Sequence, residues 1–408
     1  MKILYLSDEF PPLANGGAAI AAYDIAKAVL EKGHEVFVVT SAEDFLRAGE
    51  SAMNGIKIFT IYSKYHDFWR SYLSVYNPFL AGKIKKILTQ IRPDIVHAHN
   101  MHSHLSYYLL KLAKKNGAKV FLTAHDTMLI SYGKVFFKEN RVNYKIKFSD
   151  NIKIAGKRYN PLRNIAIKHY LRYVDKIFAI SGALRDFLAQ NGIESEVLHN
   201  GINTELWKKP PESDIQNFKN KYKIIGKKIV FFGGRLSGAK GGWQIIKAFH
   251  RIMRICPEKN VVLMIAGKEV SGEDKMKKFI QKNGMTDNVI FTGWIYREEM
   301  KTAFFVSGVC VTPSIYFDPF NLTNIEAMAA GKPVVGTCFG GAPEIVIDGE
   351  TGYIINPCDD ELMAKKICDL LMDEKKAESF GRAGKKRVEE FFSISKQADK
   401  LIDYYISQ

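Results

Sequence analysis

Short apolar runs recur along the whole chain, and stretches with helical periodicity separate them. In the first half the runs are ILYLS, EVFVVT, IKIFTIY, DIVHAH, KVFLTA, KIFAIS and EVLHN. Most of them are apolar on both faces, which is typical of parallel strands that helices cover on both sides. The first half therefore predicts an α/β domain with a parallel sheet.

The same pattern restarts after the polar, proline-containing stretch NTELWKKPPESD. The later strand candidates are KIVFFGG, VVLMIAG, NVIFTGW, GVCVTPS, KPVVGT and GYIIN, and the chain is predicted to be helical after residue 357. We therefore predict two doubly wound, Rossmann-like domains, residues 1–203 and 204–391, joined near residues 203–213. Ligand-binding motifs are then expected just after the apolar runs, at the carboxyl ends of the strands.

The net charge of the 408-residue chain is +16, with a surplus of 11 in residues 1–200 and of 5 in the rest. Such a surplus favours a polyanionic partner: a phosphorylated ligand, an anionic lipid or a nucleic acid. No apolar run approaches the length of about 18 residues that a membrane span requires. The five cysteines form no C-x-x-C pair, which suggests reduced thiols and a cytoplasmic location.

Two glycine-rich turns follow predicted strands. In GGRLSGAKGGW (233–243), Arg235 and Lys240 add two cations at a helix start, an arrangement that suits a diphosphate. The alternative is a flexible turn with solvated charges.

In EFPPLANGGAAIAAY (9–23), Gly16 and Gly17 permit close approach by a ligand. This turn is not G-x-G-x-x-G, and no acid ends EVFVVT, so a nicotinamide-type dinucleotide site is disfavoured.

Histidines gather at predicted strand ends. DIVHAHNMHSH contains His97, His99, His102 and His104, but no carboxylate or cysteine completes a metal site. We therefore expect no metal, and neutral histidines that line a polar cleft. His125 ends another predicted strand. It is either a functional side chain of the site or only a polar cap of that strand.

The stretch DPFNLTNIEAM places the two carboxylates Asp318 and Glu326 around a predicted helix start. Thr323 and Glu326 match a capping box, which explains Glu326 without a ligand. Asp318 is left unexplained by it. The free N–H groups of Leu322 and Thr323 at this helix start suit a phosphate. Alternatively, a carboxylate at this place would accept hydrogen bonds from paired sugar hydroxyls.

Taken together, these motifs resemble the retaining glycosyltransferases of family 4, whose GT-B fold has two Rossmann-like domains facing across a cleft. The resemblance includes the PP…GG turn, DIVHAH, TAHD, ISGALRDFL…VLHNGIN, GGRLSGAKGG, VTPS and DPFNLTNIEAMAAGKPVVGT…GGAPEIVIDGETGYIINP. The last block corresponds to the E-x7-E element of the family. By the same resemblance, the final helix, residues 392–408, is expected to pack back on the first domain.

The resemblance implies that Arg235 and Lys240 hold the diphosphate of a nucleotide-sugar and stabilise its developing charge. Glu326 would hold the ribose, Asp318 would bind the donor sugar, and His125 would contact the transferred sugar. The further donor contacts would come from Gly16, Gly17, Phe320, Asn321, Leu322 and Thr323. Asp318 stands where the family has glutamate, and Asn321 where it usually has glycine, so the identity of the sugar is open.

The implied reaction transfers a sugar from a nucleoside diphosphate to an acceptor hydroxyl with retention, and it needs no metal or other cofactor. A glycolipid or a polysaccharide of the cell envelope is the expected product. Two alternatives stay open: another GT-B enzyme, either a phosphorylase or a sugar-nucleotide epimerase, and a non-catalytic protein that binds membranes or polyanions.

Residues 134–172 contain eleven lysines and arginines and two acids, interleaved with aromatic residues. A solvated loop and helix face is one interpretation. The other is a peripheral surface for an anionic membrane beside the acceptor site, on the inner face of the cell membrane. Nucleic acid is the weaker alternative because no recognised binding module accompanies the charge.

Overall fold

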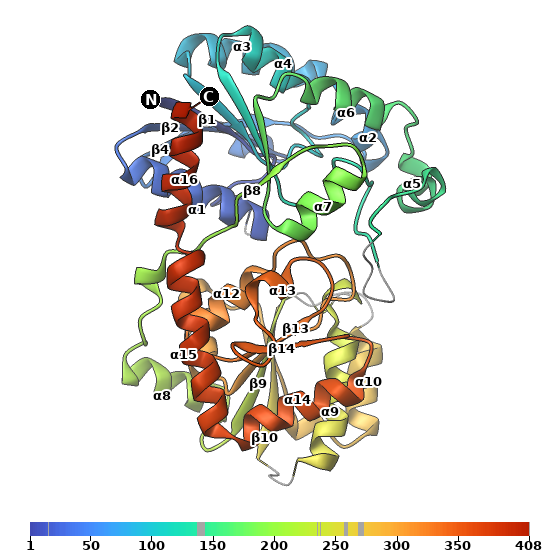
Figure 1. Cartoon of the computed structure of the whole chain (residues 1–408), viewed down its shortest axis with the longest axis vertical. Coiled ribbons are helices and arrows are strands. Elements are labelled where there is room, and N and C mark those ends of the chain that lie inside the picture. Colours follow the sequence, from blue (N-terminus) through green and yellow to red (C-terminus); the bar gives the residue numbers. More distant parts are fainter. Residues whose placement is uncertain are drawn as a thin grey trace. The chain divides into compact units, whose positions relative to one another are not determined.

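Both sets of predicted apolar runs form strands in the computed structural model, which describes residues 1–14, 16–136, 143–234, 236, 238–256, 260–267 and 273–407. The described residues divide into two units. Unit 1 contains those of Met1–Val135, Asn143–Gly201 and Ile394–Gln408, and unit 2 those of Phe136–Val142 and Ile202–Ser393. Each unit is built on its own parallel sheet with helices around it (Figure 1), which confirms the predicted α/β, Rossmann-like class.

Within the described part of unit 1, eight strands form one sheet in the order β3-β4-β2-β1-β5-β6-β7-β8. Every pairing is parallel except that of β3 with β4. The strands are β1 (Lys2–Leu6), β2 (Glu35–Ala42), β3 (Gly49–Met53), β4 (Ile56–Tyr62), β5 (Ile95–Ala98), β6 (Lys119–Ala124), β7 (Lys176–Ala179) and β8 (Glu196–Val197). β3 is the strand that the apolar pattern did not predict, and four of its five residues are exposed.

The helices of unit 1 include the long α1 and α3, which pack their apolar stripes inward. The α-helices are α1 (Gly17–Glu31), α2 (Arg70–Leu73), α3 (Pro78–Ile91), α4 (Tyr108–Lys115), α5 (Phe148–Ala155), α6 (Arg163–Leu171), α7 (Gly182–Gln190) and α16 (Ile394–Ser407). Short 3-10 turns lie at η1 (Phe45–Arg47), η2 (Asp67–Trp69) and η3 (Gly156–Arg158). The C-terminal α16 lies against α1, and its Leu401 and Tyr405 are part of the buried core.

Within the described part of unit 2, six parallel strands follow the order β11-β10-β9-β12-β13-β14. They are β9 (Lys228–Gly233), β10 (Val261–Ala266), β11 (Val289–Gly293), β12 (Val309–Thr312), β13 (Val334–Thr337) and β14 (Gly352–Ile355). The α-helices are α8 (Glu212–Lys221), α9 (Gly242–Ile255), α10 (Glu273–Lys282), α11 (Arg297–Val306), α12 (Leu322–Ala329), α13 (Ala342–Ile345), α14 (Asp360–Met372) and α15 (Glu374–Phe391), with 3-10 turns η4 (Thr204–Leu206), η5 (Gly238–Lys240) and η6 (Thr286–Asn288). The core lies between the sheet and helices that include α9 and α14.

Among the described residues, no helix has both the length and the apolar character that crossing a lipid bilayer requires.

Candidate active site

The glycine-rich turn after β9 lies against the loop that follows β12. Gly241 has a left-handed φ of 84°, and a Cβ there would lie 1.9 Å from the Pro313 carbonyl oxygen. The Ile315 N–H donates to the Ala239 carbonyl at 3.0 Å. Only glycine at position 241 permits this approach, which brings the neighbouring Lys240 to the loop after β12.

Lys240 and Asp318 form an ion pair of 2.8 Å between Nζ and Oδ2. The side chain of Asp318 is 4% exposed and that of Lys240 is 28% exposed. Ser314 donates its hydroxyl to the same carboxylate oxygen at 2.9 Å, and Nζ lies 5.5 Å from the centre of the Tyr316 ring. Burial lowers the pKa of Lys240, but the negative charge of Asp318 and its hydrogen bond to Nζ outweigh burial, so the pKa of Lys240 lies above the ordinary value. Lys240 is therefore a fixed cation at neutral pH.

A second pair of glycines fixes the backbone of Asp318. Gly340 has a φ of 76°, and a Cβ there would lie 2.1 Å from the Asp318 carbonyl oxygen. The Gly341 N–H donates to that same oxygen at 2.9 Å. The first glycine of the GGAPE motif is thus explained by its close approach to Asp318, a relationship that no local sequence pattern predicts. The contacts of Ser314 and Tyr316 with the ion pair were not predicted either.

The predicted capping box at the start of α12 is wrong. The N-cap of the helix is Asn321, whose side-chain oxygen accepts from the Thr323 N–H at 3.1 Å. The Thr323 N–H is therefore not free for a phosphate, and capping does not explain Glu326, which is half-buried one turn further on. The side chain of Phe320 is buried and packs on Phe392 with ring centres 5.7 Å apart.

The predicted site residues divide between the two units. Gly16, Gly17 and His125 belong to unit 1, and Lys240, Asp318, Phe320, Asn321, Leu322, Thr323 and Glu326 belong to unit 2. Gly16 is the N-cap of α1, the position that the turn after β1 predicts. Arg235, the second predicted diphosphate contact, lies outside the described residues.

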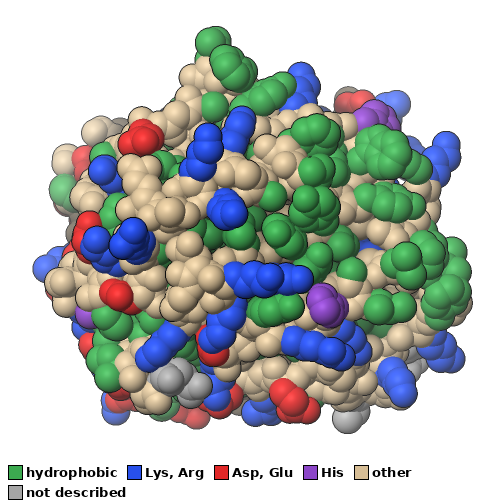
Figure 2. All heavy atoms as spheres, turned by 90° about the horizontal axis from the view of Figure 1, so that it is seen from above, with side chains coloured by type: hydrophobic (Ala, Val, Ile, Leu, Met, Phe, Trp, Pro, Cys, Tyr) green, Lys and Arg blue, Asp and Glu red, His purple; other side chains and the backbone are tan. Residues whose placement is uncertain are grey.

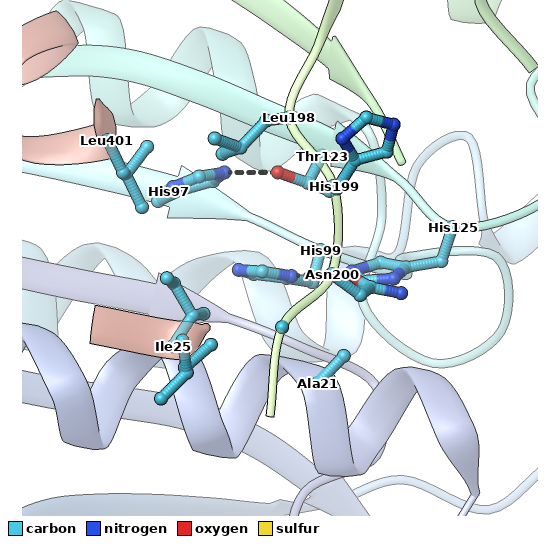
Figure 3. Close-up of a pocket in the computed structure, with 12 residues that line it drawn as sticks. Ala21, Ile25, His97, His99, Thr123, His125, Leu198, His199, Asn200 and Leu401 are labelled. Atoms are coloured by element: carbon cyan, nitrogen blue, oxygen red, sulfur yellow. Dashed lines mark hydrogen bonds between the residues drawn. The ribbon is translucent and has the colours of Figure 1, made fainter. Parts of the chain in front are cut away.

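In unit 1, His125 is hydrogen-bonded to His99. The Nε2 atom of His125 lies 2.8 Å from Nδ1 of His99, and the two rings stack with centres 5.1 Å apart. His99 in turn stacks on His97, whose Nδ1 lies 2.6 Å from the Tyr405 hydroxyl on α16. His97 Nε2 lies 2.8 Å from Thr123 Oγ1, the bond drawn in Figure 3. Hydrogen bonds and stacked rings thus connect the C-terminal helix to His125.

These three histidines are neutral in the folded protein. Burial lowers the pKa of His125 to about 4 and that of His97 to about 3, and it holds the pKa of His99 well below the ordinary value. A cavity of about 20 Å³, roughly the size of one water molecule, lies among them (Figure 3). Within the described part of the chain, His99 Nε2 and His125 Nδ1 have no hydrogen-bond partner. Both nitrogens are therefore available to a bound polar group.

The other two histidines of the cluster are bonded elsewhere. His102 Nδ1 lies 2.7 Å from the Tyr107 hydroxyl, and His104 Nδ1 lies 3.1 Å from Ser63 Oγ. No group of three or more His, Cys, Asp or Glu side chains among the residues that the structure describes is arranged to hold a metal ion. The cluster is a set of hydrogen-bonded pairs.

Unit 1 also contains a larger polar cavity of about 440 Å³ at the carboxyl ends of β1 and β2. Its lining includes Asp8, Glu9, Glu43, Tyr65 and Arg70. The buried Asp8 carboxylate accepts from three consecutive backbone N–H groups, those of residues 103–105, at 2.6 to 2.9 Å. No sequence pattern predicts this cavity, because its walls come from four strand ends far apart in the chain.

Two family models match the chain: Glycosyltransferase Family 4 over residues 15–206 and Glycosyl transferases group 1 over residues 214–387. An uncharacterized glycosyltransferase of Methanocaldococcus jannaschii is 26% identical over 99% of this chain and 98% of its own length. Among solved structures, the sucrose-phosphate synthase of Thermosynechococcus elongatus has a TM-score of 0.76 at 20% identity and covers 100% of this chain and 98% of its own. Anabaena HepE in complex with UDP-glucose has a TM-score of 0.72 at 20% identity and covers 100% of both chains.

The two family models meet near the boundary between the two parallel sheets, and together they cover most of the sequence. The resemblance drawn from the motifs is thereby confirmed. The chain is a glycosyltransferase of family 4 with the GT-B type of fold.

Proposed function

We propose that this glycosyltransferase transfers a sugar from a nucleoside-diphosphate sugar to an acceptor hydroxyl with retention of the anomeric configuration. The observation that carries the proposal is the ion pair of Lys240 with the buried Asp318 carboxylate, at the end of the glycine-rich turn. A fixed cation beside the start of α9 suits a diphosphate, whose negative charge grows as the glycosidic bond breaks. The Anabaena relative, solved with UDP-glucose, supports a donor of this class.

In this proposal Lys240 and Arg235 stabilise the departing diphosphate, and Asp318 accepts hydrogen bonds from the donor sugar. Glu326 binds the ribose, and the backbone of residues 320–323 lines the donor site with Gly16 and Gly17. His125 contacts the transferred sugar through Nδ1, the nitrogen that His99 does not occupy. The proton of the attacking hydroxyl passes to the departing phosphate oxygen, so the reaction needs no carboxylate base. Lys240 and Arg235 supply the positive charge that a metal ion would otherwise give to the diphosphate.

The acceptor is proposed to bind in the 440 Å³ cavity of unit 1. Carboxylates such as Glu9 and Glu43 accept hydrogen bonds from hydroxyl groups, and the Tyr65 ring offers an apolar face to a sugar. A glycan or the sugar end of a lipid-linked acceptor fits this lining. We place the enzyme in the cytoplasm, in the synthesis of a glycolipid or an envelope polysaccharide.

Donor binding is tested by thermal shift with a panel of nucleoside-diphosphate sugars, because a ligand that binds only the folded state raises the unfolding midpoint. The sugar that stabilises the protein is then used in single-turnover hydrolysis, with release of the nucleoside diphosphate as the readout. NMR of the glycoside formed on an acceptor hydroxyl gives the anomeric configuration. An inverted product would overturn retention, and a donor that binds without hydrolysis or transfer would favour the non-catalytic alternative.

The same assay separates the other GT-B activities. A phosphorylase would consume inorganic phosphate and release a sugar phosphate, whereas an epimerase would change the sugar without a glycan acceptor. Product formation that requires an acceptor hydroxyl and no phosphate excludes both.

A further inference from the structure

Large apolar side chains are exposed on three neighbouring segments of unit 1. We define the apolar face as Phe68, Trp69, Tyr72, Tyr76, Phe79, Phe148, Ile152, Leu162 and Ile165, which lie on η2, α2, α3, α5 and α6 and in the loops next to them. Trp69 is 52% exposed, Phe148 68% and Ile165 67%. Single exposed apolar residues are common, but a contiguous group of this size marks an interaction surface.

The segments of the apolar face are held together although they are far apart in sequence. The rings of Trp69 pack against Phe68 and Tyr72, with centres 5.2 and 5.8 Å away. Arg158 Nη1 lies 3.5 Å from Asp67 Oδ2 and connects η3 to η2. The Asn160 side chain donates to the Ser71 carbonyl at 3.1 Å and connects the loop before α6 to α2. The turn η3 and the loop before α6 are therefore held beside η2 and α2.

Cations surround the apolar face. The exposed basic side chains of α5, α6 and their loops are Lys145, Lys147, Lys153, Lys157, Lys168 and Arg172. Each of the two acids there is engaged: Asp67 pairs with Arg158, and Asp150 accepts from the backbone N–H of Lys147 at 3.0 Å. Figure 2, which looks down on unit 1, shows the hydrophobic side chains gathered on one side of this surface with Lys and Arg among and around them.

The predicted basic segment, residues 134–172, is corrected in one respect. Arg163 is only 2% exposed, and it donates to the Ser131 and Met128 carbonyl oxygens at 3.2 and 2.5 Å. It therefore anchors the loop after β6 and is not part of the surface charge. Residues 137–142 of the segment lie outside the described residues. The apolar face and its neighbouring cations belong to residues 67–79 and 143–172.

From this arrangement we infer that unit 1 docks peripherally on a lipid bilayer that contains anionic headgroups. Aromatic side chains settle in the interfacial layer of a membrane, and each nearby Lys or Arg gains from an anionic leaflet. A nucleic acid would use the cations but would give no apolar environment to Leu162 and Ile165. A bilayer accepts both kinds of side chain. The inference stands on surface side chains alone and goes beyond the proposed sugar transfer.

The charge contribution is tested by sedimentation with phosphatidylcholine vesicles, with and without phosphatidylglycerol, at low and high ionic strength. The full-length protein is expected to bind only the anionic vesicles, and less at high ionic strength. Lys153→Glu/Lys157→Glu should weaken the partition coefficient by at least about 25-fold, because each lysine contributes about fivefold near an anionic surface. The matched control, Lys57→Glu/Lys400→Glu, makes the same change in net charge on β4 and α16 and should bind nearly as wild type.

The apolar contribution is tested with Trp69, whose emission should shift to the blue when vesicles are added. Trp69→Phe should retain binding and lose most of the shift, whereas Trp69→Ser should weaken binding by about tenfold. Thermal unfolding of each variant shows whether the fold is intact. Wild type that ignores anionic vesicles at low salt would overturn the inference. An equal loss of vesicle binding in Lys153→Glu/Lys157→Glu and in the control Lys57→Glu/Lys400→Glu would also overturn it. So would vesicle binding that RNA abolishes and that Trp69→Ser leaves unchanged.

Discussion

Lys240 and Asp318, which are 78 residues apart in sequence, share an ion pair of 2.8 Å in which the carboxylate is almost fully buried. The family resemblance assigns them to different parts of the donor, the cation to the diphosphate and the acid to the sugar. Their direct contact means that each fixes the position of the other before a ligand arrives. Such preorganised charge is effective because it needs no rearrangement during the reaction.

The first prediction concerns this pair. Lys240→Ala should lower kcat/KM by about 100-fold or more, the effect of losing one preorganised charge donor. Asp318→Asn should also lower kcat/KM. Its larger effect should be a weaker preference of the enzyme for one donor sugar over another. Lys247→Ala, an exposed lysine on the same α9, is the control and should leave kcat/KM unchanged. Wild-type turnover in Lys240→Ala would remove the lysine from the proposed mechanism.

The same pair predicts coupled effects on stability. Removal of either partner leaves the other partly buried without its counter-charge, so each single variant should unfold at lower urea. The double variant Lys240→Ala/Asp318→Asn should lose less stability than the sum of the two single variants, with a coupling energy of about 0.5–3 kcal/mol. Additive losses would show that the two side chains act independently in the folded protein.

The second prediction separates the cap of α12 from the ligand site. Asn321→Ala should lower the free energy of unfolding by about 1 kcal/mol, because it removes the N-cap acceptor, and Asn321→Asp should restore it. Glu326→Gln should leave the free energy of unfolding nearly unchanged. It should weaken donor binding by about tenfold or more, because a charged hydrogen bond to the ribose is lost.

Calorimetric titration with the donor measures both effects. Unchanged donor affinity in Glu326→Gln would assign this side chain a purely structural role.

The fold was predictable because most strands are apolar on both faces and therefore stand out in the sequence. β3 was missed because its sequence, GESAM, carries no apolar run. It lies at the edge of the sheet and pairs only with β4, which makes it a strand through hydrogen bonding alone.

The site was predictable only where a residue has a local reason to stand out. Lys240 stands out because it lies in a turn with more glycines than a strand or a helix start requires. Asp318 stands out because it is an acid near a helix start that helix capping does not explain. Their pairing and the support from Gly340 depend on loops from separate strands, so no local pattern contains them. The prediction of Thr323 as the cap was wrong because Asn321 is also a good cap residue, and it is Asn321 that has the extended backbone of an N-cap.

The third prediction concerns metal. Because Lys240 is a fixed, partly buried cation beside the proposed diphosphate site, sugar transfer should proceed at the wild-type rate in excess EDTA. The measurement is donor turnover after dialysis against the chelator, with and without added Mg²⁺ or Mn²⁺. Loss of activity on chelation, and its return with either ion, would contradict this prediction.

The last prediction concerns the dependence of stability on pH. Burial lowers the pKa of His97 to about 3 and of His125 to about 4, whereas the unfolded chain binds these protons near pH 6.5. Below about pH 6.5 the unfolded state therefore holds more protons, and the free energy of unfolding should fall by about 1.4 kcal/mol per pH unit for each such histidine. This contribution is fully present above pH 6.5 and is lost as the pH falls towards 4.

Urea unfolding at pH 7, 6 and 5 measures how the free energy of unfolding depends on pH. Each variant is compared with wild type, so that the contributions of other titrating groups cancel. His97→Gln and His125→Gln should each flatten the dependence by one histidine. His169→Gln replaces an exposed histidine and should leave the slope unchanged. If the pH dependence of the free energy of unfolding is as steep in both buried-site variants as in wild type, His97 and His125 take up protons in the folded protein. The assignment of a neutral histidine cluster beside the proposed sugar site would then be wrong.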